Sequence, residues 1–106
     1  MKIGIVINTK QAETVWNALR FGLTALFRQH FVKIFLLGEG VEIEKIKDEK
    51  FDIKKCLKDF IGNNGEIIAC GTCLKLRKRS TDICPVATMK DLVSLVEESD
   101  KVLVFN

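Results

Sequence analysis

Several residue types and patterns that define common classes of protein are scarce in this sequence. Its 106 residues include one histidine, one proline and no tyrosine. The longest apolar runs, such as residues 34–37, fall far short of the ~18 residues that a membrane-spanning helix needs. The first residues hold a short apolar stretch without the small-residue cleavage motif of a secretory signal peptide. We therefore expect a cytoplasmic protein that does not enter a membrane.

Signatures of nucleotide binding and of the usual nucleophilic catalysis are missing as well. No predicted strand leads into a G-x-G-x-x-G or Walker-type loop, and the acid within Gly38-Glu39-Gly40 would repel a phosphate. The histidine, His30, precedes a predicted strand, which places it at the opposite edge of the sheet from the cysteines and argues against a Cys-His dyad. Pro85 follows Cys73 too closely for a thioredoxin-like arrangement. We expect no bound cofactor.

The composition is that of a folded domain. Hydrophobic residues make up 47% of the chain and charged residues 29%, and the length suits a single domain over residues 1–106. The formal net charge is only +3, so a general attraction to nucleic acid is weak. Four basic residues cluster at positions 75–79, and a short solvated cationic helix explains them without direct nucleic-acid binding.

Apolar periodicity predicts alternating strands and helices. We expect strands at residues 2–8, 31–37, 66–69 and 101–105, with a short edge strand at 83–86, and helices at residues 11–29, 52–61, 74–79 and 89–96. Thr9 is the expected N-cap of the first helix, and Thr88 with Asp91 resembles a capping box for the last one. The charge-rich segment 41–50 reads as a solvated loop that can hold a turn of helix. The pattern predicts a three-layer α/β sandwich with a mostly parallel sheet of four to five strands.

The candidate site follows from this topology, because ligands of open parallel sheets gather at the carboxyl ends of the strands. Cys70 ends one strand beside a helix start, where the helix dipole and free amides favour a thiolate. Cys73 follows at i+3, close enough to react with Cys70. Lys75 and Arg77 add positive charge that stabilises an anionic sulfur. Other residues at the same edge are candidates for the site, namely Asn8, Gly38, Glu39 and Cys84.

The four cysteines leave alternatives open. Two thiols at a strand-to-helix turn can serve as packing alone, since free cysteine is often buried. A zinc site would need Cys56 and Cys84 to join the CxxC pair, without a second CxxC motif or a nearby histidine, so we expect no metal. Cys56 falls on the apolar stripe of its helix and is expected in the core, whereas Cys84 in its irregular segment could approach the CxxC pair.

Three segments together resemble the DsrE/DsrF-like family of small α/β proteins. These are Asn17-Ala-Leu-Arg20, the stretch from Val32 to Val41 that contains FLLGEGV, and the stretch from Ile68 to Arg77 that contains ACGTCLKLR. The resemblance spans nearly the whole chain and implies a flavodoxin-like sandwich. The chain departs from the common Arg-Gly ending of the family's third helix, since Arg77 is followed by Lys78.

The resemblance also implies a function. Members with assigned roles are subunits of sulfur-relay complexes, often trimeric or hexameric, in which a cysteine after the third main strand carries sulfur as a persulfide. Cys70 stands at that position and Cys73 matches the second cysteine of the CxxC branch. The resulting hypothesis is a persulfide carrier that works in a homo-oligomer or with other sulfur-relay proteins, either as a stoichiometric carrier or as a sulfurtransferase-like subunit. The competing hypothesis is a non-catalytic oligomeric redox-sensing or binding module in which Cys70 and Cys73 switch between dithiol and disulfide.

Overall fold

Strands and helices alternate along the chain, as the periodicity predicts. The computed structural model describes residues 1–106, with β1 (Lys2–Ile7), α1 (Ala12–Phe27), β2 (Phe31–Leu36), the 3₁₀ helix η1 (Gly38–Lys45), α2 (Ile53–Gly62), β3 (Glu66–Cys70), α3 (Gly71–Leu76), β4 (Val86–Ala87), α4 (Met89–Glu98) and β5 (Lys101–Phe105). None of the helices combines the length and apolar character needed to cross a membrane.

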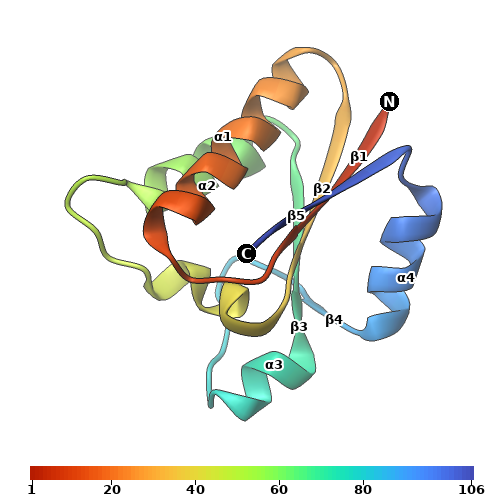
Figure 1. The fold of residues 1–106 in the computed structure, drawn as a ribbon. Helices are drawn as coiled ribbons and strands as arrows, with labels where there is room; N and C mark the ends of the chain where they lie inside the picture. Colours follow the sequence, from red (N-terminus) through yellow and green to blue (C-terminus); the bar gives the residue numbers. More distant parts are fainter.

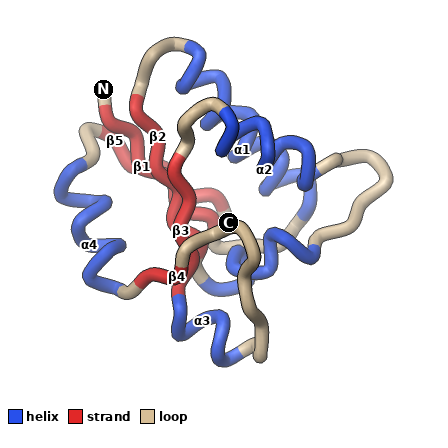
Figure 2. Tube along the Cα trace, turned by 180° about the vertical axis from the view of Figure 1, so that it is seen from behind, coloured by secondary structure: helices blue, strands red, loops and turns tan.

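The five strands form one sheet in the order β4-β3-β2-β1-β5, and every neighbouring pair is parallel. Helices α1 and α2 lie side by side on one face of the sheet and α4 lies on the other, while α3 extends beyond the ends of the strands (Figure 1). The view from behind shows the same three layers (Figure 2). The predicted three-layer α/β sandwich is confirmed.

The core lies mainly between the sheet and the α1–α2 layer. Strands β1 and β2 are central and nearly continuous in apolar residues, because both of their faces are covered. On the other face, α4 approaches the sheet closely over Gly4, where an added Cβ would overlap the side chain of Leu95. This glycine lets α4 pack directly on β1.

Three local predictions need correction. Gln11, and not Thr9, caps α1, because the Gln11 side chain accepts a hydrogen bond from the N–H of Thr14 at 2.7 Å. The Thr9 hydroxyl instead accepts a hydrogen bond from the N–H of Gln11 at 3.1 Å. The segment 41–50 holds the expected helical turn, as the end of η1 (Gly38–Lys45), but it is not solvated throughout, because Val41 and Ile43 are buried. The edge strand is β4 at 86–87 rather than 83–86, because Pro85 has no N–H and contributes only its carbonyl, to the N–H of Ala69.

Helix α3 also differs from its predicted range. It starts at Gly71, directly after β3, and ends at Leu76, instead of running from 74 to 79. Lys78 then adopts φ 51°, and the N–H groups of Lys78 and Arg79 bond to the carbonyls of Lys75 and Leu74. This is the Schellman ending of a helix, in which a left-handed residue reverses the chain. The capping box of α4, from Thr88 and Asp91, is confirmed.

Candidate functional site

The carboxyl ends of the strands meet η1 and α3 at one end of the molecule. Cys70 is both the last residue of β3 and the N-cap of α3, so no loop separates the strand from the helix. The residue is only 2% exposed and belongs to the hydrophobic core. The sequence therefore places the first cysteine of the CxxC motif correctly at the sheet edge, but its side chain lies beneath the surface.

Cys73 lies on the first turn of α3 and is only partly buried. Its sulfur accepts a hydrogen bond from the backbone N–H of Gly38, at 3.2 Å. Gly38 has φ 55°, and a Cβ at this position would overlap the Oδ1 atom of Asn8. Of the residues predicted for the edge, the structure thus brings together Asn8, Gly38 and Cys73, next to Cys70.

The Cys70 thiol is one of the groups that set the acidity of Cys73. Burial, followed by the neighbouring Cys70 thiol, raises the pKa of Cys73. The N–H of Gly38 and the guanidinium of Arg77 act in the opposite direction, because both stabilise a thiolate. Cys73 is consequently a protonated thiol at neutral pH that has two thiolate-stabilising groups beside it.

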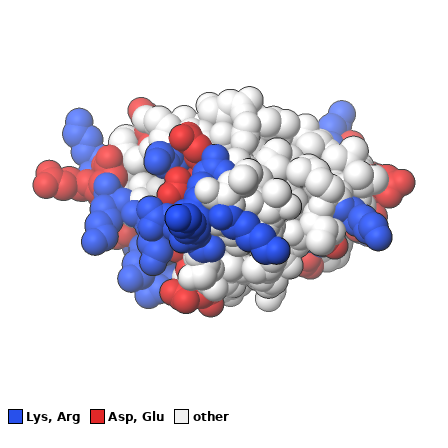
Figure 3. Space-filling view, turned by 90° about the horizontal axis from the view of Figure 1, so that it is seen from below, with Lys and Arg blue, Asp and Glu red and all other residues white.

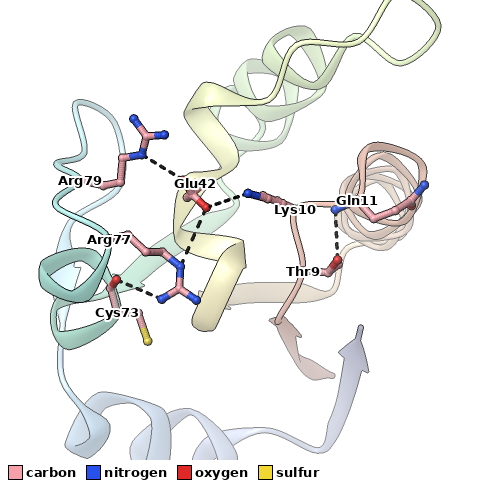
Figure 4. A network of polar contacts seen from close by, with 7 residues as sticks. All are labelled: Thr9, Lys10, Gln11, Glu42, Cys73, Arg77 and Arg79. Carbon is pink, nitrogen blue, oxygen red and sulfur yellow. Dashed lines mark hydrogen bonds and ion pairs between the residues drawn. The ribbon is translucent and has the colours of Figure 1, made fainter.

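An acidic residue outside the predicted site organises the charges around it. Glu42, on η1, forms ion pairs with Arg79 at 3.0 Å, Lys10 at 3.5 Å and Arg77 at 3.9 Å, and its side chain is only 12% exposed. The Nη1 atom of Arg77 also donates to the carbonyl of Cys73 at 3.3 Å. Figure 4 shows Arg77 between Glu42 and Cys73, so this arginine fastens α3 to η1.

Sequence reasoning missed Glu42 because the residue lies in a charge-rich segment without clear periodicity. The hydrogen bond from Arg79 is the main cause that lowers the pKa of Glu42, and it outweighs the effect of burial. The one local signal was the run of mixed acids and bases over residues 42–50, and such runs are too common on protein surfaces to be informative.

Two predicted contributors stay apart from the sulfurs. Lys75 is exposed in the last turn of α3, and Glu39 is exposed at the start of η1. Neither side chain forms a hydrogen bond or an ion pair in the structure. Of the two cations predicted to support the site, only Arg77 contacts it.

Cys84 is buried, at 3% exposure, in the segment between α3 and β4. The polar groups that face its thiol are Glu44 and Thr81, and burial together with the charge of Glu44 raises the pKa of Cys84 to about 12. Glu44 also accepts hydrogen bonds from the Thr81 hydroxyl and the N–H of Asp82, which outweigh its burial and lower its pKa. Cys84 therefore belongs to the packing that joins this segment to η1.

The end of the molecule that carries the motif is rich in charge of both signs. Figure 3 looks onto this end and shows Lys and Arg side chains gathered on one side, with acidic groups among them. A hollow of about 370 Å³ beside η1 has a mixed lining that includes Lys10, Lys47, Arg79, Glu42 and Asp48. All four cysteines are free, and no three His, Cys, Asp or Glu side chains lie close enough together to hold a metal ion.

Comparisons with known proteins agree with the observed fold. Two relatives are uncharacterised proteins. One, from Methanopyrus kandleri, is 41% identical over 88% of this chain and 83% of its own length. The other, from Methanocaldococcus jannaschii, is 35% identical over 99% of this chain and 100% of its own length. A conserved protein of unknown function from Bacteroides thetaiotaomicron has the same fold, with a TM-score of 0.80 at 20% identity over 98% of this chain and 94% of its own. The model of the DsrE/DsrF-like family matches residues 1–105, and the chain belongs to that family.

Proposed function

We propose that this chain is a sulfur-relay protein that holds sulfane sulfur as a persulfide on Cys70. The observation that carries the proposal is the position of the CxxC motif, with Cys70 at the end of β3 and Cys73 one turn later against the Gly38 amide. The family assignment supports a role in sulfur relay. A partner persulfide supplies the sulfur and a partner thiol receives it, so the chain needs no cofactor of its own.

The burial of Cys70 suits a holding site. A persulfide carries a reactive terminal sulfur, and at 2% exposure the Cys70 side chain is shielded from thiols in bulk solvent. The neighbouring Cys73 thiol provides a sulfur for exchange. The first turn of α3, which begins directly after Cys70, has backbone N–H groups without helical partners.

Incubation of the reduced protein with glutathione persulfide tests this function. We expect the intact mass to increase by one sulfur atom, peptide mapping to place that sulfur on Cys70, and the adduct to survive desalting. Cys70→Ala should abolish the retained sulfur, whereas Cys56→Ser, a change of a half-buried cysteine outside the site, should not. Absence of any added sulfur in the wild type would refute the carrier function. Formation of a Cys70–Cys73 disulfide in its place would favour the redox module.

We also propose that the chain assembles with copies of itself through the α4 face. Side chains on this side are apolar and exposed because no second helix covers them: Met89 54%, Val93 56% and Val96 51% on α4, and Val104 58% on β5. Exposed apolar side chains grouped on one face are typical of an interface. Light scattering after gel filtration should give a trimer or hexamer. Val93→Asp should reduce it to monomers, and Phe27→Asp, exposed on the opposite layer, should not.

For partners other than copies of the chain, we expect proteins and not nucleic acid. The basic side chains near the site alternate with Glu42 and Asp48, and Glu42 already neutralises part of their charge. A phosphate backbone would be repelled by these acids, whereas a protein surface can match both signs. Binding of a single-stranded RNA oligonucleotide at physiological salt, lost on Arg79→Ala, would contradict this expectation.

A further inference from the structure

The two cysteines of the motif differ sharply in access. Cys70 is 2% exposed and packs in the core, whereas Cys73 is only partly buried and its sulfur meets the Gly38 amide at the start of η1. A donor must bring its sulfur within bonding distance of the accepting thiolate. Cys73 is therefore the sulfur that a donor reaches first, although Cys70 is the better protected place to keep a persulfide.

Resting on the function proposed above, we propose that sulfur is loaded onto Cys73 and then passed to Cys70. Cys73 is the exchange thiol of this scheme, and Cys70 is the holding thiol. The side chains lie one helical turn apart and close enough for the Cys70 thiol to perturb Cys73, so the second transfer needs no large movement of the backbone.

Both steps balance without an oxidant or a reductant. In the first step the Cys73 thiol gives up its proton and its sulfur attacks the terminal sulfur of a donor persulfide. The S–S bond of the donor breaks, and the donor leaves as a thiolate that takes up the proton released by Cys73. In the second step the Cys70 thiolate attacks the terminal sulfur now held on Cys73. The S–S bond on Cys73 breaks, Cys70 becomes the persulfide, and Cys73 leaves as a thiolate that takes up the proton released by Cys70.

The groups around Cys73 suit a sulfur that acts as the nucleophile in the first step and as the leaving group in the second. The Gly38 N–H, 3.2 Å from the Cys73 sulfur, donates to the thiolate that leaves in the second step. The positive charge of Arg77 lies near the same sulfur. Its guanidinium donates a hydrogen bond to the Cys73 carbonyl at 3.3 Å and forms an ion pair with Glu42 at 3.9 Å. Because Glu42 and the carbonyl fix this arginine, the charge remains beside Cys73 during both steps.

A time course of loading tests the order of transfer. Reduced full-length protein is mixed with glutathione persulfide, samples are blocked with iodoacetamide at intervals, and peptide mass spectrometry measures the persulfide on each cysteine. We expect sulfur on Cys73 at early times and on Cys70 later. In Cys73→Ser, Cys70 should reach the same final loading but at least about tenfold more slowly, because the donor must reach a buried thiol. Cys56→Ser is the matched control and should load at the wild-type rate.

The outcomes separate the order of transfer from the carrier function itself. If the wild type takes up no sulfur on either cysteine, the carrier function fails. If Cys73→Ser loads Cys70 as fast as the wild type, the carrier function stands and the order proposed here is wrong. Iodoacetamide alone gives a second measurement on the unaltered protein: Cys73 should be alkylated before Cys70, and equal rates for the two thiols would also overturn the proposal.

Discussion

The backbone N–H of Gly38 donates to the sulfur of Cys73 at 3.2 Å, across 35 positions of the sequence. This contact joins the start of η1 to the first turn of α3 and sets the position of the sulfur that we propose to exchange with donors. It depends on glycine in two ways, because φ is 55° and because a Cβ would overlap Asn8.

Gly38→Ala should weaken both the fold and the reactivity of Cys73. A left-handed φ costs an L-residue about 1–2 kcal/mol, to which the overlap with Asn8 adds. Since the Gly38 N–H lowers the pKa of Cys73, its displacement should raise that pKa further and slow alkylation at mildly alkaline pH several-fold. Urea unfolding and timed alkylation measure the two effects.

Gly62→Ala is the matched control for this substitution. Gly62 ends α2, has no atoms within 4 Å of an added Cβ, and does not have a positive φ. Alanine there should leave Cys73 unchanged and stabilise the helix slightly. Wild-type stability and wild-type Cys73 reactivity in Gly38→Ala would show that the contact does not position the sulfur.

Glu42→Gln should destabilise the protein by about 1–2 kcal/mol at neutral pH, since Lys10, Arg77 and Arg79 lose a shared partner that is largely shielded from water. The hydrogen bond from Arg79 lowers the pKa of Glu42 in the folded state. The contribution of Glu42 to the free energy of unfolding is therefore present above the usual pKa range of glutamate, and it is lost as the pH falls through the lowered pKa of the folded state. Urea midpoints at about pH 7 and at about pH 3 should therefore differ more in the wild type than in the variant. Equal differences would show that Glu42 does not contribute to acid sensitivity.

The contrast between Cys70 and Glu42 explains how far the sequence predicts the site. Cys70 could be placed because the strand pattern of 66–69 fixes which edge of a parallel sheet it reaches, and the CxxC spacing fixes Cys73 relative to it. Glu42 could not, because its partners Lys10 and Arg79 come from distant segments that meet only after the sheet and η1 have formed. Contacts of this kind depend on tertiary packing and leave no local periodicity.

Lys78→Gly should stabilise the protein. Lys78 reverses the chain after α3 with φ 51°, a conformation that costs an L-residue about 1–2 kcal/mol and glycine very little. The larger conformational entropy of glycine in the unfolded chain offsets part of this, which leaves a gain of up to about 1 kcal/mol and a rise in Tm of about 4 °C.

Lys78→Ala separates backbone strain from charge in that experiment. Alanine removes the same cation but keeps the Cβ, so its Tm should stay near that of the wild type. Thermal unfolding followed by circular dichroism measures both variants. An equal gain in the two would mean that repulsion among the cations of α3, and not the left-handed backbone, costs stability at this turn.

Cys84 should make the protein less stable in alkali. Burial, and then the charge of Glu44, raises the pKa of the Cys84 thiol to about 12, whereas the same thiol in the unfolded chain titrates near ~8.5. Between these values the unfolded chain has lost a proton that the folded chain still holds, so the free energy of unfolding falls as the pH rises. The chain has no tyrosine that would also titrate in this range.

Urea midpoints measured between about pH 7 and pH 10 should decline in the wild type and decline less steeply in Cys84→Ala. The slope that remains in the variant is due to Cys56 and Cys73, because burial also raises the pKa values of these two thiols. Identical slopes in the two proteins would show that the Cys84 thiol is open to solvent and not held against Glu44.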